Sequence, residues 1–273
     1  MATNEKKHPI CEKHPFLACL VLMIIGLFAP SVGGLFPASD TVQYLVGIVL
    51  CIFILIIYGL WFAPQFNGVA KLMVPMNVVL LFIGIFCIYV LAGEIVTILF
   101  LGISFNISIS AVIMALTAGV CEETSFRAMS IPIGMRYFKS KNKVMTTVIL
   151  MSLIFGVVHM GNALNGADIG MSIIQVVNSF FMGVFLSALY LRTGSIVPSM
   201  FAHLLIDFVS FAFDPMVNKE GLLTEALTGK YLTDSVIQVC ITVILGIIGF
   251  YMLRKAQQDE IDRIWNEKWS VRA

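Results

Sequence analysis

Residues 42–63 read VQYLVGIVLCIFILIIYGLWFA, a run of 22 residues without one charged side chain. About 20 apolar residues in a helix, at about 1.5 Å per residue, cross the roughly 30 Å hydrocarbon core of a bilayer. The run is continuously apolar rather than alternating, which indicates a helix and not a barrel strand. Because a helix satisfies its own backbone hydrogen bonds in lipid, this stretch predicts a transmembrane helix.

The same pattern recurs along the whole chain. Hydrophobic residues make up 59% of the 273 residues and charged residues 12%, and the mean hydropathy is +0.96, which excludes an ordinary soluble domain. We therefore expect an all-α, polytopic membrane bundle of about eight helices that forms one domain over residues 1–273. The expected spans are residues 16–36, 42–63, 76–101, 108–130, 144–162, 171–191, 195–213 and 234–253.

The first apolar run has a second interpretation. It follows Lys6, Lys7 and Lys13 and contains small residues, so it also resembles a secretory signal. Seven further runs with short connections make a retained first helix the simpler interpretation.

Lys and Arg are distributed unevenly between alternate connections. If the N-terminus is cytoplasmic, the inside segments carry 14 of these residues, and only Lys219 and Lys230 fall outside. The positive-inside rule then predicts that both termini are cytoplasmic. The inside residues are Lys6, Lys7, Lys13, Lys71, Arg136, Lys139, Lys141, Lys143, Arg192, Arg254, Lys255, Arg263, Lys268 and Arg272.

The C-terminal segment, residues 254–273, predicts an amphipathic cytoplasmic tail. Ile261, Ile264, Trp265 and Trp269 recur there at helical spacing among charged residues. Such a segment either lies as a helix on the inner headgroups or remains a solvated tail. The net charge of +1, without a basic cluster interleaved with aromatics, argues against a nucleic-acid partner.

The six cysteines show no paired, metal-type spacing. All but Cys11 lie within apolar runs, so we expect buried small hydrophobic residues. Cys121, next to Glu122, is an alternative nucleophile for a cysteine-peptidase scheme, although nothing in the sequence indicates a stabilised thiolate.

Ionisable residues gather in three of the expected spans, where each is costly unless it is paired or faces a wet cavity. Glu94 in the third span is the outlier. The clustered residues are Glu122, Glu123 and Arg127 in the fourth span, His159 with Asn162 in the fifth, and His203 with Asp207 in the seventh.

Helical spacing assigns a geometry to the acidic pair. Positions four apart share a helix face, so Glu123 and Arg127 are predicted to pair, whereas Glu122 points elsewhere and is free for chemistry. Polar contacts that only hold helices together are the structural alternative. Two histidines, two glutamates, an arginine and an aspartate exceed what packing requires.

Three motifs in these spans resemble those of a known family. Glu122-Glu123-Thr-Ser-Phe-Arg127 resembles EExxxR, Phe155-Gly-Val-Val-His159 resembles FxxxH, and His203-Leu-Leu-Ile-Asp207 resembles HxxxN/D. In this order, each on its own helix, they are typical of the CPBP family of CAAX proteases and bacteriocin-processing enzymes, also called Abi. The resemblance covers about residues 108–213.

The resemblance implies an intramembrane endopeptidase related to type II CAAX prenyl endopeptidases. Glu122 would be the general base that takes a proton from water, and His159 would help to position or activate that water. His203 and residue 207 would stabilise the oxyanion, and Arg127 would orient the acidic pair. The substrate would be a peptide or lipidated protein at the bilayer, although the sequence does not identify it.

Asp207 departs from the asparagine found in well-studied CAAX enzymes. An ionised carboxylate cannot donate a hydrogen bond to an oxyanion. Asp207 is therefore either protonated or has another role, such as holding His203 in one tautomer. In that case Asn162 would supply the amide donor.

Metal-free catalysis is the favoured interpretation, with zinc as the alternative cofactor. Glu122, His159 and His203 form a two-His, one-Glu set of the kind that catalytic zinc uses. The sequence contains no HExxH helix, however, and these ligands would have to converge from three spans.

Two functions outside the enzyme class remain as alternatives. A proton-coupled transporter also buries Glu, His and Asp, but neither an internal repeat nor paired broken helices is evident. A non-catalytic scaffold or immunity protein on the same fold is the other. The oligomeric state is not indicated, and the compact chain favours a bacterial cytoplasmic membrane.

The expected depths of the three main site residues do not agree. At about 1.5 Å per residue, Glu122 and His203 each lie about 12 Å from the inner end of their spans, whereas His159 lies about 22 Å away. A fifth helix that starts near Lys143 as a cytoplasmic extension would reduce this difference.

Overall fold

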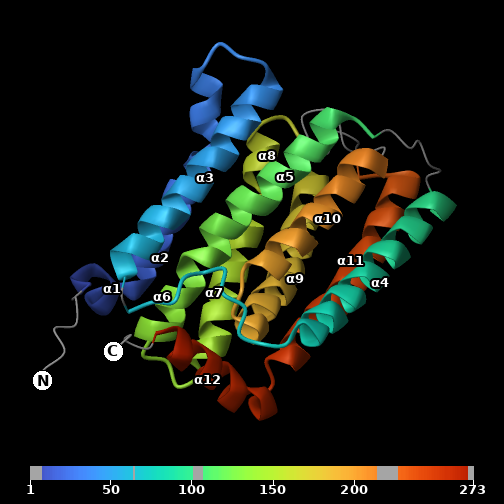
Figure 1. Cartoon of the computed structure of the whole chain (residues 1–273). Helices are drawn as coiled ribbons and strands as arrows, with labels where there is room; N and C mark the ends of the chain where they lie inside the picture. The colour runs from blue at the N-terminus through green and yellow to red at the C-terminus, as the bar shows by residue number, and fades with distance from the viewer. Residues whose placement is uncertain (1–7, 64, 101–106, 214–226, 270–273) are drawn as a thin grey trace, which may run out of the picture.

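The computed structural model describes residues 8–63, 65–100, 107–213 and 227–269, and every regular element in these ranges is a helix (Figure 1). The predicted all-α class is therefore confirmed. The longer helices are α2 (Pro15–Phe28), α3 (Asp40–Phe62), α4 (Met76–Phe100), α5 (Ile109–Glu123), α7 (Lys143–Val158), α9 (Ile169–Thr193), α10 (Val197–Phe213), α11 (Gly229–Met252) and α12 (Gln258–Lys268). The shorter segments are α1 (Pro9–Lys13), η1 (Pro30–Leu35), η2 (Thr124–Ala128), α6 (Ser130–Tyr137), α8 (Gly161–Leu164) and η3 (Lys255–Gln257).

Seven helical segments among the described residues are long and apolar enough to cross a bilayer, and α10 is a shorter apolar helix beside them. The prediction of about eight spans agrees with this arrangement. Two boundaries were wrong. The fourth span continues through η2 and α6 to Tyr137 instead of ending near residue 130, and the eighth begins at Gly229 rather than residue 234.

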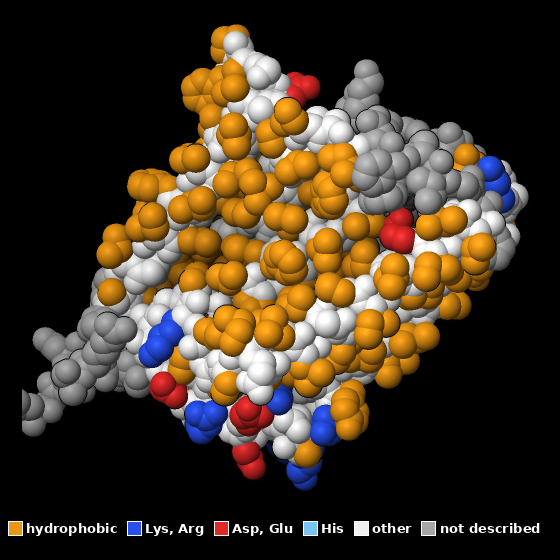
Figure 2. Space-filling view, turned by 45° about the vertical axis from the view of Figure 1, so that its right-hand side comes forward, with side chains coloured by type: hydrophobic (Ala, Val, Ile, Leu, Met, Phe, Trp, Pro, Cys, Tyr) orange, Lys and Arg blue, Asp and Glu red, His pale blue; other side chains and the backbone are white. Residues whose placement is uncertain are grey.

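The surface of the molecule is that of an integral membrane protein. Large apolar side chains such as Leu60, Leu80 and Ile88 are 67%, 63% and 70% exposed, respectively, a pattern that is unfavourable in water and natural in lipid. Figure 2 shows hydrophobic side chains along the sides of the bundle, with most of the visible charged side chains at the end where α12 lies. The chain therefore spans a membrane.

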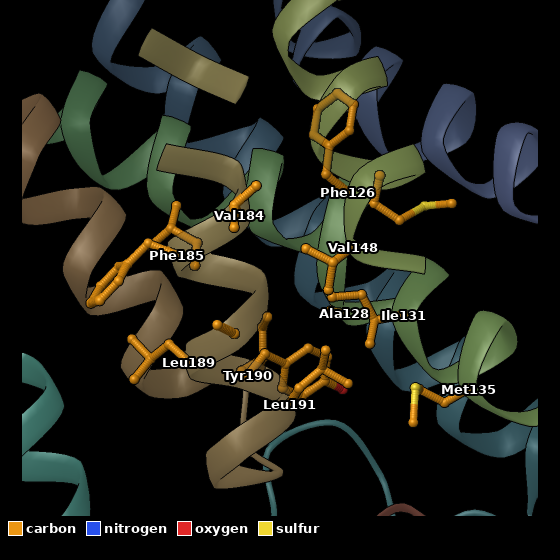
Figure 3. Packing of buried hydrophobic residues seen from close by; sticks show 14 of the residues in the cluster. Phe126, Ala128, Ile131, Met135, Val148, Val184, Phe185, Leu189, Tyr190 and Leu191 are labelled. Atoms are coloured by element: carbon orange, nitrogen blue, oxygen red, sulfur yellow. The ribbon is translucent and has the colours of Figure 1, made fainter. Parts of the chain in front are cut away.

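Helix α9 is the centre of the bundle. It packs on α7, α10 and α11, while α5 packs on α10 and α3, and α4 covers α11 and α10. Figure 3 shows Phe126 from η2, Val148 from α7 and Phe185 and Tyr190 from α9 in this hydrophobic core. The core fixes α5, α7 and α10, the helices that carry the predicted site residues, relative to one another.

Helix α12 lies across one end of the bundle, at the same end as α1 (Figure 1). Its apolar residues Ile261, Ile264 and Trp265 are buried, and the Trp265 Nε1–H group donates a hydrogen bond to the Leu191 carbonyl at 3.2 Å. The predicted amphipathic helix is therefore present. Its apolar face contacts protein, however, and not the headgroups, because α12 packs on α6 and α9.

Lys268, the last residue of α12, is a buried cation outside the membrane spans. Its ammonium group donates to the Lys71 carbonyl at 3.2 Å and lies 5.6 Å from the centre of the Phe66 ring. Burial, reinforced by the positive charge of Lys71, lowers the pKa of Lys268 to about 7. Protonated Lys268 is thus a charge held in an apolar setting.

We expect Lys268→Met to stabilise the protein most below pH 7. The folded pKa lies below the ordinary lysine value, so the unfolded chain binds more protons between about pH 7 and the unfolded pKa. The burial cost is fully present below pH 7 and disappears as the pH rises. The effect is a few kcal/mol at most, since one pKa unit corresponds to about 1.4 kcal/mol. Thermal unfolding of wild type and variant from pH 6 to 10 measures the difference in stability between them. A stability difference that increases with pH would contradict the description of Lys268 as a buried cation.

The cysteines follow the sequence interpretation only in part. Cys11, Cys19, Cys51 and Cys121 are buried, but Cys87 and Cys240 are exposed. The two exceptions lie on α4 and α11, on membrane-spanning helices where an exposed apolar side chain faces lipid. All six thiols are free.

Candidate active site

The acidic pair lies where α5 passes into a π-helical turn. Residues 124–128 form this turn, η2, and the amide of Met129 donates to the Thr124 carbonyl five residues back at 3.3 Å. Ser125 Oγ donates to the Cys121 carbonyl at 2.7 Å and occupies part of the widened turn. Such π turns concentrate at functional sites because they reorient side chains without ending the helix.

Glu123 is the fully buried centre of a hydrogen-bond network. Its Oε1 atom lies 2.7 Å from Arg127 Nη1 and 2.8 Å from His203 Nδ1, and its Oε2 atom accepts from Ser199 Oγ at 2.5 Å. These donors offset the cost of burying its charge. The predicted pairing of Glu123 with Arg127 is confirmed.

Arg127 is also fully buried, and its guanidinium lies on an aromatic ring. The Cζ atom is 4.0 Å from the centre of the Phe155 ring, a cation–π contact that joins η2 to α7. The Nη1 donor is used by Glu123, whereas Nε and Nη2 have no hydrogen-bond partner among the described residues. Arg127 therefore supports the acidic pair from behind and does not face the cavity.

Glu122 points in another direction, as the helical spacing predicted. It lines a cavity of about 580 Å³, and its side chain is 30% exposed. Its Oε2 atom lies 3.6 Å from His203 Nε2. Two adjacent carboxylates therefore occupy different environments, one enclosed by donors and one facing open space.

His203 on α10 connects these two environments. Its Nδ1 atom is hydrogen-bonded to Glu123, which leaves Nε2 directed toward the carboxylates of Glu122 and Asp207, each 3.6 Å away. The hydrogen bond to Glu123 orients the ring. Glu123 forms the shorter contact with this ring, and Asp207 forms a longer contact with its other nitrogen.

His159 is the residue that ends α7, one position beyond Val158. Its Nδ1 atom lies 2.7 Å from the Phe155 carbonyl oxygen, an acceptor, so Nδ1 carries the proton. In a neutral ring, Nε2 then has a free lone pair. His159 lines the same cavity as Glu122, so this lone pair belongs to a base that faces the cavity.

Asp207 and Asn162 complete the set predicted from sequence. Asp207 lies one turn beyond His203 and lines the cavity with its side chain 24% exposed. Asn162 on α8 also lines the cavity, but its Nδ2 group donates to Gln175 Oε1 at 2.8 Å. One amide proton of the proposed donor is therefore already used.

The seven predicted residues thus form two groups, according to whether they line the cavity. Glu122, His159, Asn162, His203 and Asp207 line it, whereas Glu123 and Arg127 lie behind its wall. Ser199 was not predicted from the sequence as a site residue, although its spacing of four residues from His203 places it on the same face of α10.

The structure explains the disagreement in depth between Glu122 and His159. Because the helix of Glu122 continues to Tyr137, Glu122 lies about 22 Å from its inner end, close to the value of about 24 Å for His159 measured from Lys143. The error was therefore mainly in the fourth span.

The three residues considered as zinc ligands are not grouped around one point in the structure. Across residues 8–63, 65–100, 107–213 and 227–269, no three His, Cys, Asp or Glu side chains are grouped closely enough to hold a metal ion. In this arrangement, Glu122, His159 and His203 line one cavity without converging on one point.

Together, the fold and the site define a polytopic membrane protein with a cavity of about 580 Å³, lined by a glutamate and two histidines. Residues 104–209 match the family described as type II CAAX prenyl endopeptidase Rce1-like. This match agrees with the resemblance to CAAX proteases, and the matched residues contain all three motifs. Comparisons with curated proteins and with solved structures gave no match.

Proposed function

We propose that this protein is a glutamate-type intramembrane endopeptidase that cleaves a peptide or lipidated protein near its terminus. The observation that supports the proposal is the difference in surroundings between the two adjacent glutamates. Glu123 is enclosed by Arg127, His203 and Ser199, while Glu122 faces the cavity. A carboxylate without a strong partner, beside a neutral imidazole, has the properties of a general base.

In the proposed reaction, Glu122 takes a proton from a water molecule as the water oxygen attacks the scissile carbonyl carbon. The Nε2 lone pair of His159 accepts a second hydrogen bond from that water and orients it. The carbon–nitrogen bond then breaks, and the proton held by Glu122 passes to the leaving amine. Each group acts within the cavity, where fixed dipoles can stabilise the charge that develops in the reaction.

His203 is the proposed oxyanion donor. With Nδ1 bonded to Glu123, a protonated ring directs its Nε2–H group into the space between Glu122 and Asp207. Asp207 would favour the charged imidazolium, which is a better donor to a developing negative oxygen than a neutral ring. This role accounts for aspartate at position 207 without requiring it to donate a hydrogen bond.

A catalytic zinc ion remains the alternative within the peptidase class. Glu122 and the two histidines offer suitable donor types, but binding would require them to move closer together. Metal analysis of active protein after chelator treatment distinguishes the two schemes. Retained activity with less than one equivalent of metal supports the glutamate mechanism.

Orientation in the membrane belongs to the same proposal. Because 14 Lys and Arg residues fall in alternate connections with the two termini, we propose that both termini are cytoplasmic, in a bacterial cytoplasmic membrane. The helices α1 and α12 lie at one end of the bundle, which supports an even number of crossings. Labelling of single cysteines placed at either terminus in sealed vesicles tests the orientation.

The cleavage assay itself uses purified protein in lipid nanodiscs. The first probe is a fluorogenic peptide with a farnesylated cysteine in a CAAX sequence, and the second is the same peptide without the lipid. Cleavage of either peptide supports the peptidase assignment, and the ratio of the two cleavage rates shows whether a lipid is required. Absence of cleavage of these and of a wider peptide library by folded protein would overturn it.

Close contact between α5 and α10 sets the spacing of Glu122 and His203. A Cβ atom on Gly119 would lie 2.9 Å from the backbone nitrogen of Leu204, so Gly119→Ala must push the two helices apart. We expect a loss of about 1–3 kcal/mol in stability and up to about 100-fold in kcat, because small displacements misalign reacting groups. Gly84→Ala, which meets no atom within 4 Å, is the control. Equal effects of both variants would refute the contact.

A further inference from the structure

A second polar region lines the cavity away from the proposed catalytic residues. It lies on α11 and α4, where Gln238 Nε2 donates to the Gly93 carbonyl at 3.0 Å and to Thr97 Oγ1 at 3.1 Å. Tyr89 and Thr242 pair through their hydroxyls at 2.9 Å. These polar groups therefore satisfy one another.

Asp234 in the same region does not follow this pattern. It is 1% exposed and lines the cavity, yet neither of its carboxylate oxygens has a hydrogen-bond partner among the described residues. Asn178 on α9 also lines the cavity. Like the two carboxylate oxygens of Asp234, its Oδ1 atom is a buried acceptor without a hydrogen-bond partner among the described residues. Buried acceptors of this kind are costly unless a ligand supplies donors.

The position of Asp234 along the bundle can be estimated from two contacts to α9. Its neighbour Ser235 contacts Met171, and Ser199, one turn from His203, contacts the Leu186 carbonyl. Met171 and Leu186 are 15 residues apart on α9, which corresponds to about 22 Å along the helix at about 1.5 Å per residue. Because α10 runs antiparallel to α9, His203 lies about 6 Å from Ser199 in the direction of Met171. Asp234 therefore lies about 16 Å from the level of His203 along the bundle. An extended peptide covers this distance in about five residues.

We propose that Asp234 is a specificity subsite that binds a basic side chain, lysine or arginine, of the substrate about five residues from the cleaved bond. Ammonium and guanidinium groups carry several donors and no acceptor, which matches a site of unpartnered acceptors. Their positive charge also compensates the buried carboxylate. This inference rests on the proposed peptidase function for its substrate and on Asp234 alone for its charge preference.

The test measures binding separately from cleavage. The probes are farnesylated, fluorescent CAAX peptides in which one lysine replaces glutamine at successive positions of a neutral sequence. Their dissociation constants are measured by fluorescence anisotropy with Glu122→Ala protein in nanodiscs, and kcat/KM is measured with protein that retains Glu122. We expect lysine about five residues from the scissile bond to tighten binding tenfold or more, the effect of about one charge-assisted hydrogen bond.

Asp234→Asn keeps the shape of the side chain and removes its charge, so the lysine-to-glutamine preference should fall to about one. Asp259→Asn makes the same chemical change on an exposed residue of α12 and should keep the preference. Equal binding of the two peptides to protein carrying Asp234 overturns the subsite even if both are cleaved. Lysine-dependent binding without cleavage supports the subsite and contradicts the peptidase function instead.

Discussion

Glu122→Gln should lower kcat by at least about 1,000-fold while the protein remains folded, within the range expected for loss of a positioned general base. Glutamine has nearly the same size as glutamate but cannot accept a proton from water. Because the Glu122 side chain is 30% exposed and lines the cavity, its replacement leaves no buried charge unpaired. Stability should therefore change little.

The measurement is the initial rate of peptide cleavage in nanodiscs, with protein amounts normalised by size-exclusion chromatography. Asp259→Asn, an exposed carboxylate outside the cavity, is the matched control and should retain the full rate. A Glu122→Gln variant that keeps more than about a tenth of the rate would be inconsistent with general-base catalysis by this residue. A large loss of thermal stability would instead indicate that Glu122 is structural.

Whereas Glu122→Gln should lower kcat with little effect on stability, Arg127→Met should lower the stability of the protein strongly. Removal of one partner from a buried ion pair leaves the other charge uncompensated and typically costs about 3–5 kcal/mol. Glu123 would keep its contacts with His203 and Ser199 but lose its only arginine contact, at 2.7 Å. The cation–π contact with Phe155 would be lost as well.

A double substitution separates charge from packing in this experiment. Glu123→Gln combined with Arg127→Met removes both charges, so it should recover a substantial part of the stability that Arg127→Met loses. Arg263→Met, at an exposed pair on α12, should change the free energy of unfolding by less than about 1 kcal/mol. If Arg127→Met resembled Arg263→Met in denaturant titrations, the buried pair would have no structural role.

The sequence predicted the fold class well because membrane insertion depends mainly on local composition. Each long apolar run must form a helix in lipid, so about eight spans could be read directly. The pairing of Glu123 with Arg127 was also predictable, since residues four apart on a helix are neighbours. Even the different direction of Glu122 follows from this geometry.

Other features had no local signal in the sequence. The π turn at residues 124–128 interrupts the regular helical period without a proline or glycine to mark it. The continuation of the fourth span from residue 130 to Tyr137 was not predicted either. Asp234 was read as the first residue of its span, a position where a charge is unremarkable. In the structure α11 begins at Gly229, which places Asp234 within the span.

By itself, the sequence determined a helical membrane protein and named the side chains available for chemistry, because hydrophobic length and helical period are properties of continuous segments. Only the tertiary structure decided that Glu123 bonds to His203 and Ser199, that Glu122 faces the cavity, and that α12 packs on protein. These contacts join residues far apart in the chain. They depend on how helices pack, which no single segment specifies.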